Sequence, residues 1–564
     1  MKTNLLFLLP VITALTITSC SLDFNPSDEI SADILLHQEG GAECIIDGCY
    51  ATLKDPVHYI QYSGGNSFVC HYYHTQEFPT DNVTLSGITT DALYNAYSYK
   101  MTDDLKSPGV MWWLSYKVCY MANTVIETLT EGANVDDDQL LGEAYFLRAF
   151  MHQTLLWMFS KPYCCGRDNL GVVIRTTSQT TETKRATVGE CYDQVVKDLI
   201  KAASLMTEEG RGNGGYACKN TALGLLSRMY LYMGKDKEAI DTVLGMLGGS
   251  DGSDKLEPSA TFPTYFANAV TSKETLFCIA HTALETQGQA SVGSMYINDG
   301  MGWGEVYASN PILDLYERYP EDLRYTSFIV PQVLDSTKLF VTFADPGTPE
   351  PLISGRVPLT FQVAPEGENY TFTDGGVKYT VKKVARTNPE YNNEWEVTYP
   401  QGGETWPARV TVQMKNRNNY FQYYVTKFSY QDGDPMLSSP VILRWGEVIL
   451  NLAEAYAHLG DVDNALKYVN VMRRRACIRE EGMFSKTQMH GYTNILDVVM
   501  DERRLELAFE ADRRMDVYGN KKSMNRLYPG CHPYEIIDYT ADKIQYPIPL
   551  GEYSVSGIEK NPGY

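Results

Sequence analysis

Five aromatic residues in two glycine-containing stretches of the sequence have the chemistry to bind a sugar. A flat ring can cover the apolar C–H face of a pyranose, while carboxylate, amide and guanidinium groups hold its hydroxyls. The chain has 40 tyrosines and 7 tryptophans, and most of them must serve the core, so only rings in predicted loops are informative. The candidate ligand-binding residues are Tyr72, Tyr73, Tyr296, Trp303 and Tyr307, with Asp81 and Asn82 as polar partners.

These candidates come from two predicted loops that are far apart in the sequence. Glycines and a proline break the helical pattern between residues 59 and 85, and glycines flank Trp303 between residues 291 and 307. If the two loops converge, they form one shallow platform of aromatic rings. The competing interpretation of each ring is a side chain tucked onto the body of the protein.

A metal site is the other chemistry that the first loop suggests. His71, His74 and Glu77 are spaced three residues apart, as ligands on one helical turn would be, and Cys70 lies next to His71. The glycine- and proline-rich flanks do not predict a helix there, and no further ligand follows. We therefore predict no metal or other cofactor, and the sequence leaves open whether calcium is bound.

Catalysis and nucleic-acid binding are both disfavoured. The sequence contains neither a His-Glu-x-x-His zinc motif nor a Gly-x-x-x-x-Gly-Lys-Ser/Thr phosphate-binding loop, and no carboxylate pair stands in a recognisable catalytic context. The formal net charge of -22 repels a phosphate backbone. We predict a binding protein, not an enzyme, with no nucleic-acid partner.

Two helical hairpins with the same internal spacing must position these loops. One pattern recurs at identical offsets in both, namely Leu226, Ser227, Tyr230, Gly234 and Ala239, then Leu452, Ala453, Tyr456, Gly460 and Ala465. This is the spacing of a tetratricopeptide unit. More than two hundred residues separate the copies, so we expect hairpins that meet in space with long insertions between them.

A third stretch, residues 501 to 517, predicts one more helix with an unusual charge pattern. Apolar and charged residues share every face, so some of the charges must be buried. Arg503 and Glu506 lie three residues apart, as do Glu510 and Arg513, which predicts ion pairs within the helix.

The N-terminus has the pattern of an exported protein. Residues 1–19 have a basic start and an apolar centre too short to span a bilayer, which is typical of a signal peptide. Small residues precede Cys20, as in a bacterial lipobox, so we predict acylation of Cys20 and a polar tether over residues 20–28. The alternative is a plain secretory signal with an incidental cysteine.

The remaining chain, residues 29–564, is predicted to be mainly α-helical. Helical periodicity dominates residues 29–250 and returns at Arg444, within a second part that spans residues 260–564. Residues 327–430 are β-rich, with a hairpin signal at Asp-Gly-Gly, and we interpret them as an insertion.

Four motifs together resemble the SusD/RagB family of outer-membrane nutrient-binding lipoproteins. They are the hairpin with Trp112, Ala122-Asn123 and Leu147-Arg-Ala149, the tetratricopeptide units, the helix at 501–517, and the ending Tyr546-Pro-Ile-Pro549 with Asn561-Pro-Gly-Tyr564. Ala511 stands where the family usually has glycine. The resemblance implies a fold of four tetratricopeptide-like hairpins with a second, irregular half.

The resemblance also implies a function. It predicts a lipid-anchored, surface-exposed outer-membrane protein that captures oligosaccharides and passes them to a SusC-like TonB-dependent transporter. Some relatives import peptides, so the alternative is a helical-repeat scaffold for a peptide or protein ligand.

Overall fold

The fold is visible over most of the chain. The computed structural model describes residues 38–56, 67–87, 92–179, 183–299, 301–344, 358–384, 395–528, 530–533 and 536–564. The predicted signal peptide, Cys20 and the tether lie outside the described residues, and the predicted domain boundaries stay predictions.

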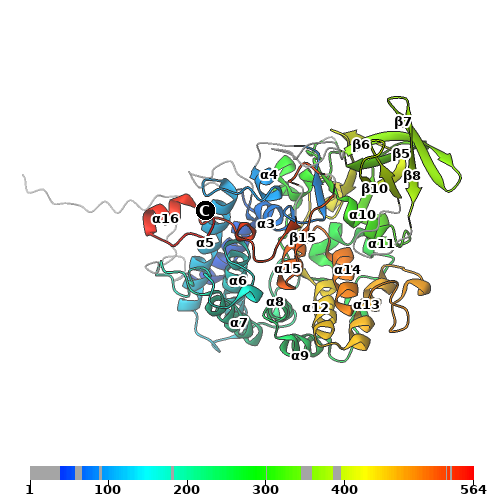
Figure 1. The fold of residues 1–564 in the computed structure, drawn as a ribbon. Coiled ribbons are helices and arrows are strands. Elements are labelled where there is room, and N and C mark those ends of the chain that lie inside the picture. The colour runs from blue at the N-terminus through cyan, green and yellow to red at the C-terminus, as the bar shows by residue number, and fades with distance from the viewer. Residues whose placement is uncertain are drawn as a thin grey trace, which may run out of the picture.

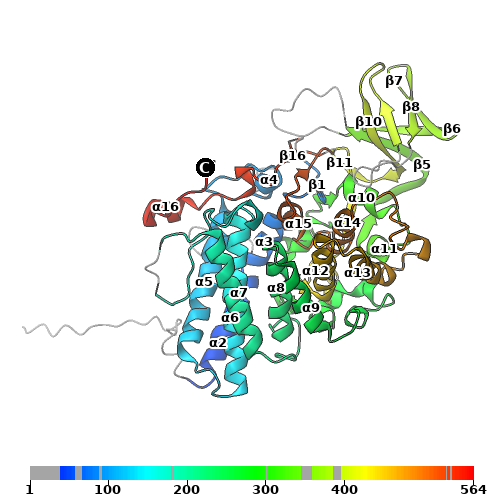
Figure 2. The same ribbon diagram turned by 60° about the horizontal axis from the view of Figure 1, so that its bottom comes forward.

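A continuous row of helices forms one side of the molecule (Figure 2). Its members are α2 (Gly41–Lys54), α5 (Lys106–Thr128), α6 (Val135–Phe159), α7 (Val188–Leu205), α8 (Lys219–Tyr232), α9 (Asp236–Leu247), α12 (Trp445–His458) and α13 (Val462–Arg475). From α5 onward each helix packs against the next in this order. The predicted mainly helical, tetratricopeptide-like fold is therefore confirmed.

The two matching hairpins, α8–α9 and α12–α13, contact each other directly. Helix α12 packs against both α8 and α9, and Asn451 Nδ2 donates to Ser227 Oγ at 3.2 Å. Gly234 and Gly460, the shared glycines of the pattern, turn the chain at φ 68° and 74°, a conformation that glycine adopts without strain. The prediction that distant hairpins meet in space is correct.

The helix predicted over residues 501–517 is in fact two helices, α14 (Ile495–Leu507) and α15 (Arg513–Gly519). Phe509 and Ala511 between them have φ of 72° and 74°. Their N–H groups donate to the buried carboxylate of Glu77, each at 3.1 Å. The backbone leaves the helix to cap this carboxylate, which explains why glycine suits the position of Ala511.

The charges of this region are buried, as predicted, but their partners are not the predicted ones. Glu506 accepts hydrogen bonds from Arg444 at 2.6 Å and Arg324 at 3.1 Å, and pairs with Arg475. Glu510 pairs with Arg444 and Lys427 at 2.7 and 2.6 Å. The pairs expected within the helix do not form, because each charge faces another element in the core.

Short elements complete the body around this row. The helices are α3 (Phe68–Glu77), α4 (Ala92–Tyr97), α10 (Asn310–Tyr316), α11 (Leu323–Phe328) and α16 (Leu550–Ser556). The strand pairs are β1 (Val83–Leu85) with β3 (Val306–Ala308), β2 (Thr275–Cys278) with β14 (Val441–Arg444), β4 (Ile329–Pro331) with β13 (Tyr423–Val425), β11 (Asn416–Arg417) with β12 (Tyr420–Phe421), and β15 (Met524–Asn525) with β16 (Ile536–Ile537).

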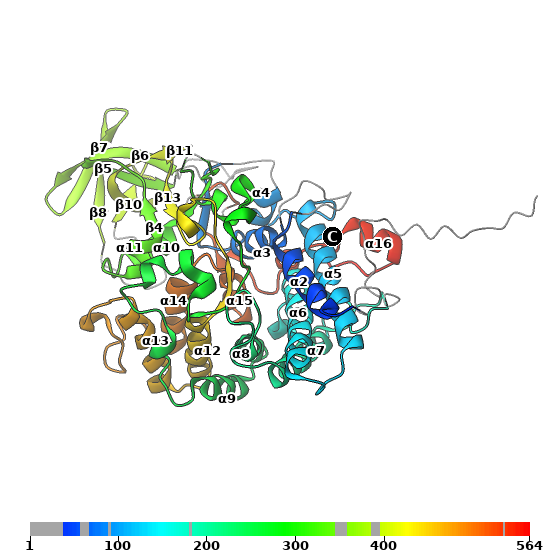
Figure 3. The same ribbon diagram turned by 180° about the vertical axis from the view of Figure 1, so that it is seen from behind.

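The β-rich insertion is a closed antiparallel barrel. Its strands are β5 (Val333–Ala344), β6 (Pro358–Glu366), β7 (Asn369–Asp374), β8 (Val377–Lys383), β9 (Trp395–Thr398) and β10 (Thr405–Met414), and β10 closes onto β5. The predicted Asp-Gly-Gly hairpin joins β7 to β8. The barrel has its own apolar core and lies at the opposite end of the molecule from α16 (Figures 1 and 3).

Across the described part of the chain, no helix has both the length and the apolar character that crossing a membrane requires.

Candidate functional site

The two predicted aromatic loops do converge, but inside the core. Residues 68–77 form helix α3, not a loop, and every side chain of α3 is buried. The Tyr73 and Tyr296 rings both pack on Phe428, with centroids 4.9 and 5.5 Å away. The expectation that Tyr72, Tyr73, Tyr296 and Tyr307 are exposed is wrong, since none is more than 2% accessible.

Trp303 is the predicted ring that reaches the surface. Its side chain is 48% exposed, and its Nε1 donates to the carbonyl of Gln289 at 3.3 Å. Arg417 Nη1 donates to the Trp303 carbonyl at 3.1 Å and Nη2 pairs with Glu305 at 2.6 Å. The indole is therefore held from its backbone and its N–H while its ring stays open to solvent.

Two tyrosines that the sequence did not single out lie beside this loop. A hollow of ≈ 480 Å³ lies at this loop, because Asn298 and Asp299 form part of its lining. Its lining includes Asn298, Asp299, Lys415, Tyr424 and Tyr430. Trp303 itself does not line this hollow, but Asn298 and Asp299 belong to the same loop. We call the five lining residues together with Trp303 the Trp303 face.

Tyr430 brings a hydroxyl donor to this surface. It is 42% exposed, and its hydroxyl donates to Asp299 Oδ2 at 3.3 Å. Partial burial and then the neighbouring Asp299 carboxylate raise its pKa, so the phenol stays protonated at neutral pH. Tyr430 meets the criterion that selected Trp303, an aromatic ring in a loop beside glycine and small polar residues, because Asp432 and Gly433 follow it.

Backbone strain concentrates on and around the Trp303 face. Asp299, Tyr430 and Asp432 have φ of 32°, 69° and 51°, and Asn418 and Asn419, next to Arg417, have φ of 53° and 69°. Non-glycine residues in this region of φ cost free energy and gather at ligand-binding sites. Asn418 and Asn419 form the two-residue turn between β11 and β12, where such angles are expected. The angles at Asp299, Tyr430 and Asp432 belong to the loops of the Trp303 face itself.

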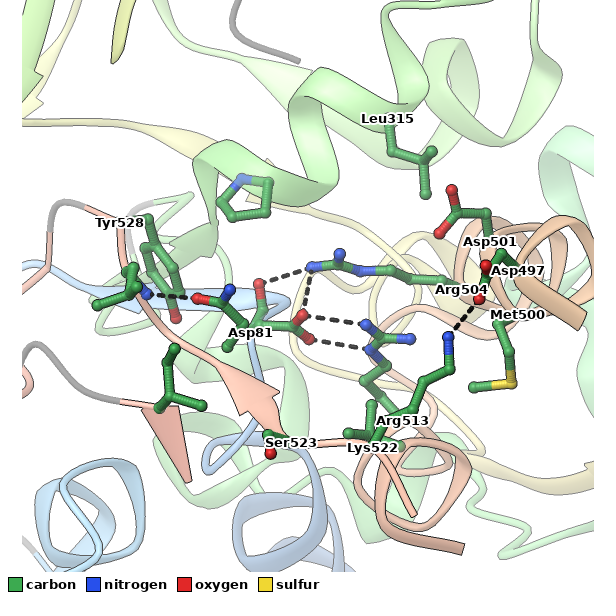
Figure 4. Close-up of a pocket in the computed structure, with 15 residues that line it drawn as sticks. Asp81, Leu315, Asp497, Met500, Asp501, Arg504, Arg513, Lys522, Ser523 and Tyr528 are labelled. Carbon is green, nitrogen blue, oxygen red and sulfur yellow. Dashed lines mark hydrogen bonds and ion pairs between the residues drawn. The ribbon is translucent and has the colours of Figure 1, made fainter. Parts of the chain in front are cut away.

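The predicted polar partners Asp81 and Asn82 lie elsewhere. Asp81 accepts hydrogen bonds from Arg513 Nε and Nη2 at 2.9 and 3.0 Å, and Asn82 Oδ1 accepts from Arg504 Nε at 2.8 Å. Burial would raise the pKa of Asp81, but Arg504 and Arg513 lower it to about 2. Asp81 lines a separate charged pocket (Figure 4) and shares no hollow with Trp303.

Comparison with known families identifies the chain. A profile described as "Starch-binding associating with outer membrane" matches residues 31–231, and one described as "SusD family" matches residues 273–564, more than half of the sequence. The chain belongs to the SusD family.

Relatives of this SusD-family chain span its full length. SusD-like protein P2 of Formosa agariphila is 22% identical over 98% of both chains. A SusD superfamily structure from Bacteroides thetaiotaomicron matches with a TM-score of 0.68 and 22% identity, covering 94% of this chain and 100% of that one. A laminarin-binding SusD-like protein matches with a TM-score of 0.60 and 18% identity, covering 93% and 100%. At these identities the structural matches establish the fold.

The metal-like spacing of the SusD-family chain lies on helix α3. Cys70 Sγ donates to the Ala290 carbonyl at 2.9 Å, and His71 Nδ1 lies 3.1 Å from Ser107 Oγ. Burial lowers the pKa of His71 to about 4 and that of His74 to about 3, so both rings are neutral. Among the described residues no three His, Cys, Asp or Glu side chains are grouped as metal ligands would be.

A hydrolase-like spacing also occurs in this SusD-family chain, at residues 248–252, which read Gly-Gly-Ser-Asp-Gly. A nucleophile elbow places such a serine between a strand and a helix. Here Ser250 follows the end of helix α9, and its hydroxyl donates to Asp254. The local structure is a helix end, not an elbow.

Proposed function

We propose that this chain is a surface lipoprotein that binds oligosaccharides on the Trp303 face and delivers them to a SusC-like TonB-dependent transporter in the outer membrane. It acts as a binding protein, without catalysis and without a cofactor. The observation that carries the proposal is an exposed indole on a loop whose residues Asn298 and Asp299 line a hollow with two tyrosines, in a chain of the SusD family.

The chemistry of the Trp303 face suits a sugar. The Trp303 and Tyr430 rings offer apolar surface, at about 0.5–1.5 kcal/mol for each aromatic contact beyond area burial. Asp299, Asn298 and Lys415 supply acceptors and donors for hydroxyls at the hollow that Tyr430 lines. A neutral oligosaccharide needs no compensating charge. This agrees with the lining of the hollow, which has one acidic residue, Asp299, and one basic residue, Lys415.

Binding is tested by titration calorimetry of the mature protein against plant and host oligosaccharides and, in parallel, short peptides. We expect an oligosaccharide ligand, and Tyr430→Ala should weaken its binding by about 1 kcal/mol. Tyr120→Ala is the matched control, because Tyr120 is 43% exposed on helix α5. Binding of peptides alone would replace this proposal with a peptide-importing role.

Membrane attachment is tested at Cys20. Cys20→Ser should move the protein out of the outer-membrane fraction, because acyl chains contribute about 0.8 kcal/mol for each buried methylene. Unchanged recovery from the outer membrane would contradict lipid anchoring through this residue.

A further inference from the structure

A second pocket, apart from the Trp303 face, lies between helices α10, α14 and α15 and the β15–β16 pair (Figure 4). Its volume is ≈ 450 Å³, within the range of about 300–1,000 Å³ typical of small-molecule sites. Apolar side chains, among them Leu315, Met500 and Val517, form part of its wall. The rest of the wall is charged.

Two arginines of this pocket share one carboxylate. Arg513 binds both oxygens of Asp81, and Arg504 Nη2 lies 3.2 Å from Asp81 Oδ2. The other Asp81 contacts of Arg504 go to the main-chain carbonyl, which is neutral.

Three acidic and three basic side chains line the pocket, so its lining carries no net charge. Lys522 pairs with Asp497. Asp501 accepts a hydrogen bond from Tyr492 and lies 3.7 Å from Arg318, which is outside the lining. A preference for an anion therefore depends on the guanidinium donors of Arg504 and Arg513 that remain free.

Each of these arginines also has a donor group to spare. The Nη1 atoms of Arg504 and Arg513 make no hydrogen bond to any described residue, and neither is enclosed by protein. Figure 4 shows the guanidinium groups of Arg504 and Arg513 both directed at Asp81. Burial and the nearby positive charge of Arg513 lower the pKa of Arg504, although the Asp81 carboxylate raises it.

We propose that this pocket binds a small organic molecule through a singly charged oxyanion, a carboxylate or a sulfate ester, held by Arg504 and Arg513. The free guanidinium nitrogens would donate to such an oxyanion in charge-assisted hydrogen bonds. The apolar wall would cover the body of the ligand. The pocket and the Trp303 face have no lining residue in common, so the two sites are independent.

The first test uses the unaltered protein. Calorimetry with glucuronate, glucose 6-sulfate and glucose compares two anions with their neutral parent. We expect at least one anion to bind at least about tenfold more tightly than glucose, as charged hydrogen bonds imply. Glucuronate alone would identify a carboxylate site, and both anions a general oxyanion site. Equal binding of all three, or binding of none, would overturn the proposal.

The second test uses two variants with opposite expected effects. Arg513→Gln removes one of the two guanidinium donors and should weaken anion binding at least about tenfold. Asp81→Asn removes one carboxylate from the lining and should leave anion binding equal or tighter. A loss in both variants would assign these residues to the scaffold. Trp303→Ala is the control, and a loss of anion binding there would place the anion on the Trp303 face instead.

Discussion

Helix α3 and the Trp303 loop look alike in sequence, since each combines aromatic and small polar residues next to glycine, yet they have opposite surroundings. Tyr73 is 0% exposed and its hydroxyl donates to the Val441 carbonyl, whereas Trp303 is 48% exposed. Helix α3 is covered by α5, α15 and neighbouring segments, while two residues of the Trp303 loop, Asn298 and Asp299, line the hollow at Tyr430. Composition identifies rings that could bind a ligand, and packing decides which of them can reach one.

The same contrast separates the buried scaffold from the Trp303 face. The scaffold, represented by α3 and the charges of α14, should contribute to stability alone. The Trp303 face should contribute to binding alone. A folded scaffold variant that loses ligand binding, or a variant of the Trp303 face that loses stability, would contradict this division.

The largest effect is expected for Glu506→Ala. The variant leaves Arg324, Arg444 and Arg475 without their shared buried carboxylate. Breaking a buried ion pair by removing one partner costs about 3–5 kcal/mol. Urea denaturation measures the change, and Glu481→Ala, at an exposed carboxylate, should stay within about 0.5 kcal/mol of the parent.

A comparable but smaller effect is expected for Tyr73→Ala. Removing a fully buried aromatic ring costs about 3–5 kcal/mol, and here the surrounding rings of Tyr72 and Phe428 can relax partly into the space. The same denaturation experiment measures the loss. A stability within 0.5 kcal/mol of the parent would mean that α3 is not packed as described.

A pH effect of at most about 3 kcal/mol is expected at the junction of the two matching hairpins. His458 on α12 contacts Asp236 on α9 at 2.8 Å and Asn520 at 2.7 Å. Burial would lower the pKa of His458, but Asp236, Glu454 and Asn520 together raise it to about 9.

Because the folded pKa lies above the unfolded value of about 6.5, the protonated ring stabilises the fold fully below pH 6.5. This contribution is lost as pH rises through about 9. Thermal melts between pH 6 and 10 should show the loss, and His458→Gln should remove it. An identical pH profile in that variant would contradict the assignment.

The helical part of the fold could be predicted because periodicity reports an apolar face directly. Helices α5 to α9, α12 and α13 each bury such a face, and the repeated glycines marked the turns at Gly234 and Gly460. Helix α3 was missed because it is buried on all sides and so has no apolar stripe. The break after Leu507 was missed because its cause, Glu77, lies more than four hundred residues earlier.

The candidate site was predictable only in part. A glycine-flanked tryptophan identified the Trp303 loop, but exposure depends on which elements cover a ring, and Tyr296 lies in the same stretch of chain with no exposure. Partners such as Arg444 for Glu510, and Arg513 for Asp81, come from distant elements and leave no local signal. Sequence spacing therefore could not assign them.

The most direct test of this division compares Trp303→Ala with Tyr73→Phe for the oligosaccharide that the parent protein binds. Calorimetric affinity is measured for each variant, and stability is measured by urea denaturation. Trp303→Ala should weaken binding by at least about 1 kcal/mol and leave stability within about 0.5 kcal/mol. Tyr73→Phe should lower stability by about 1 kcal/mol, through the lost hydrogen bond to Val441, with affinity unchanged. Unchanged affinity in Trp303→Ala together with lost affinity in folded Tyr73→Phe would contradict the account.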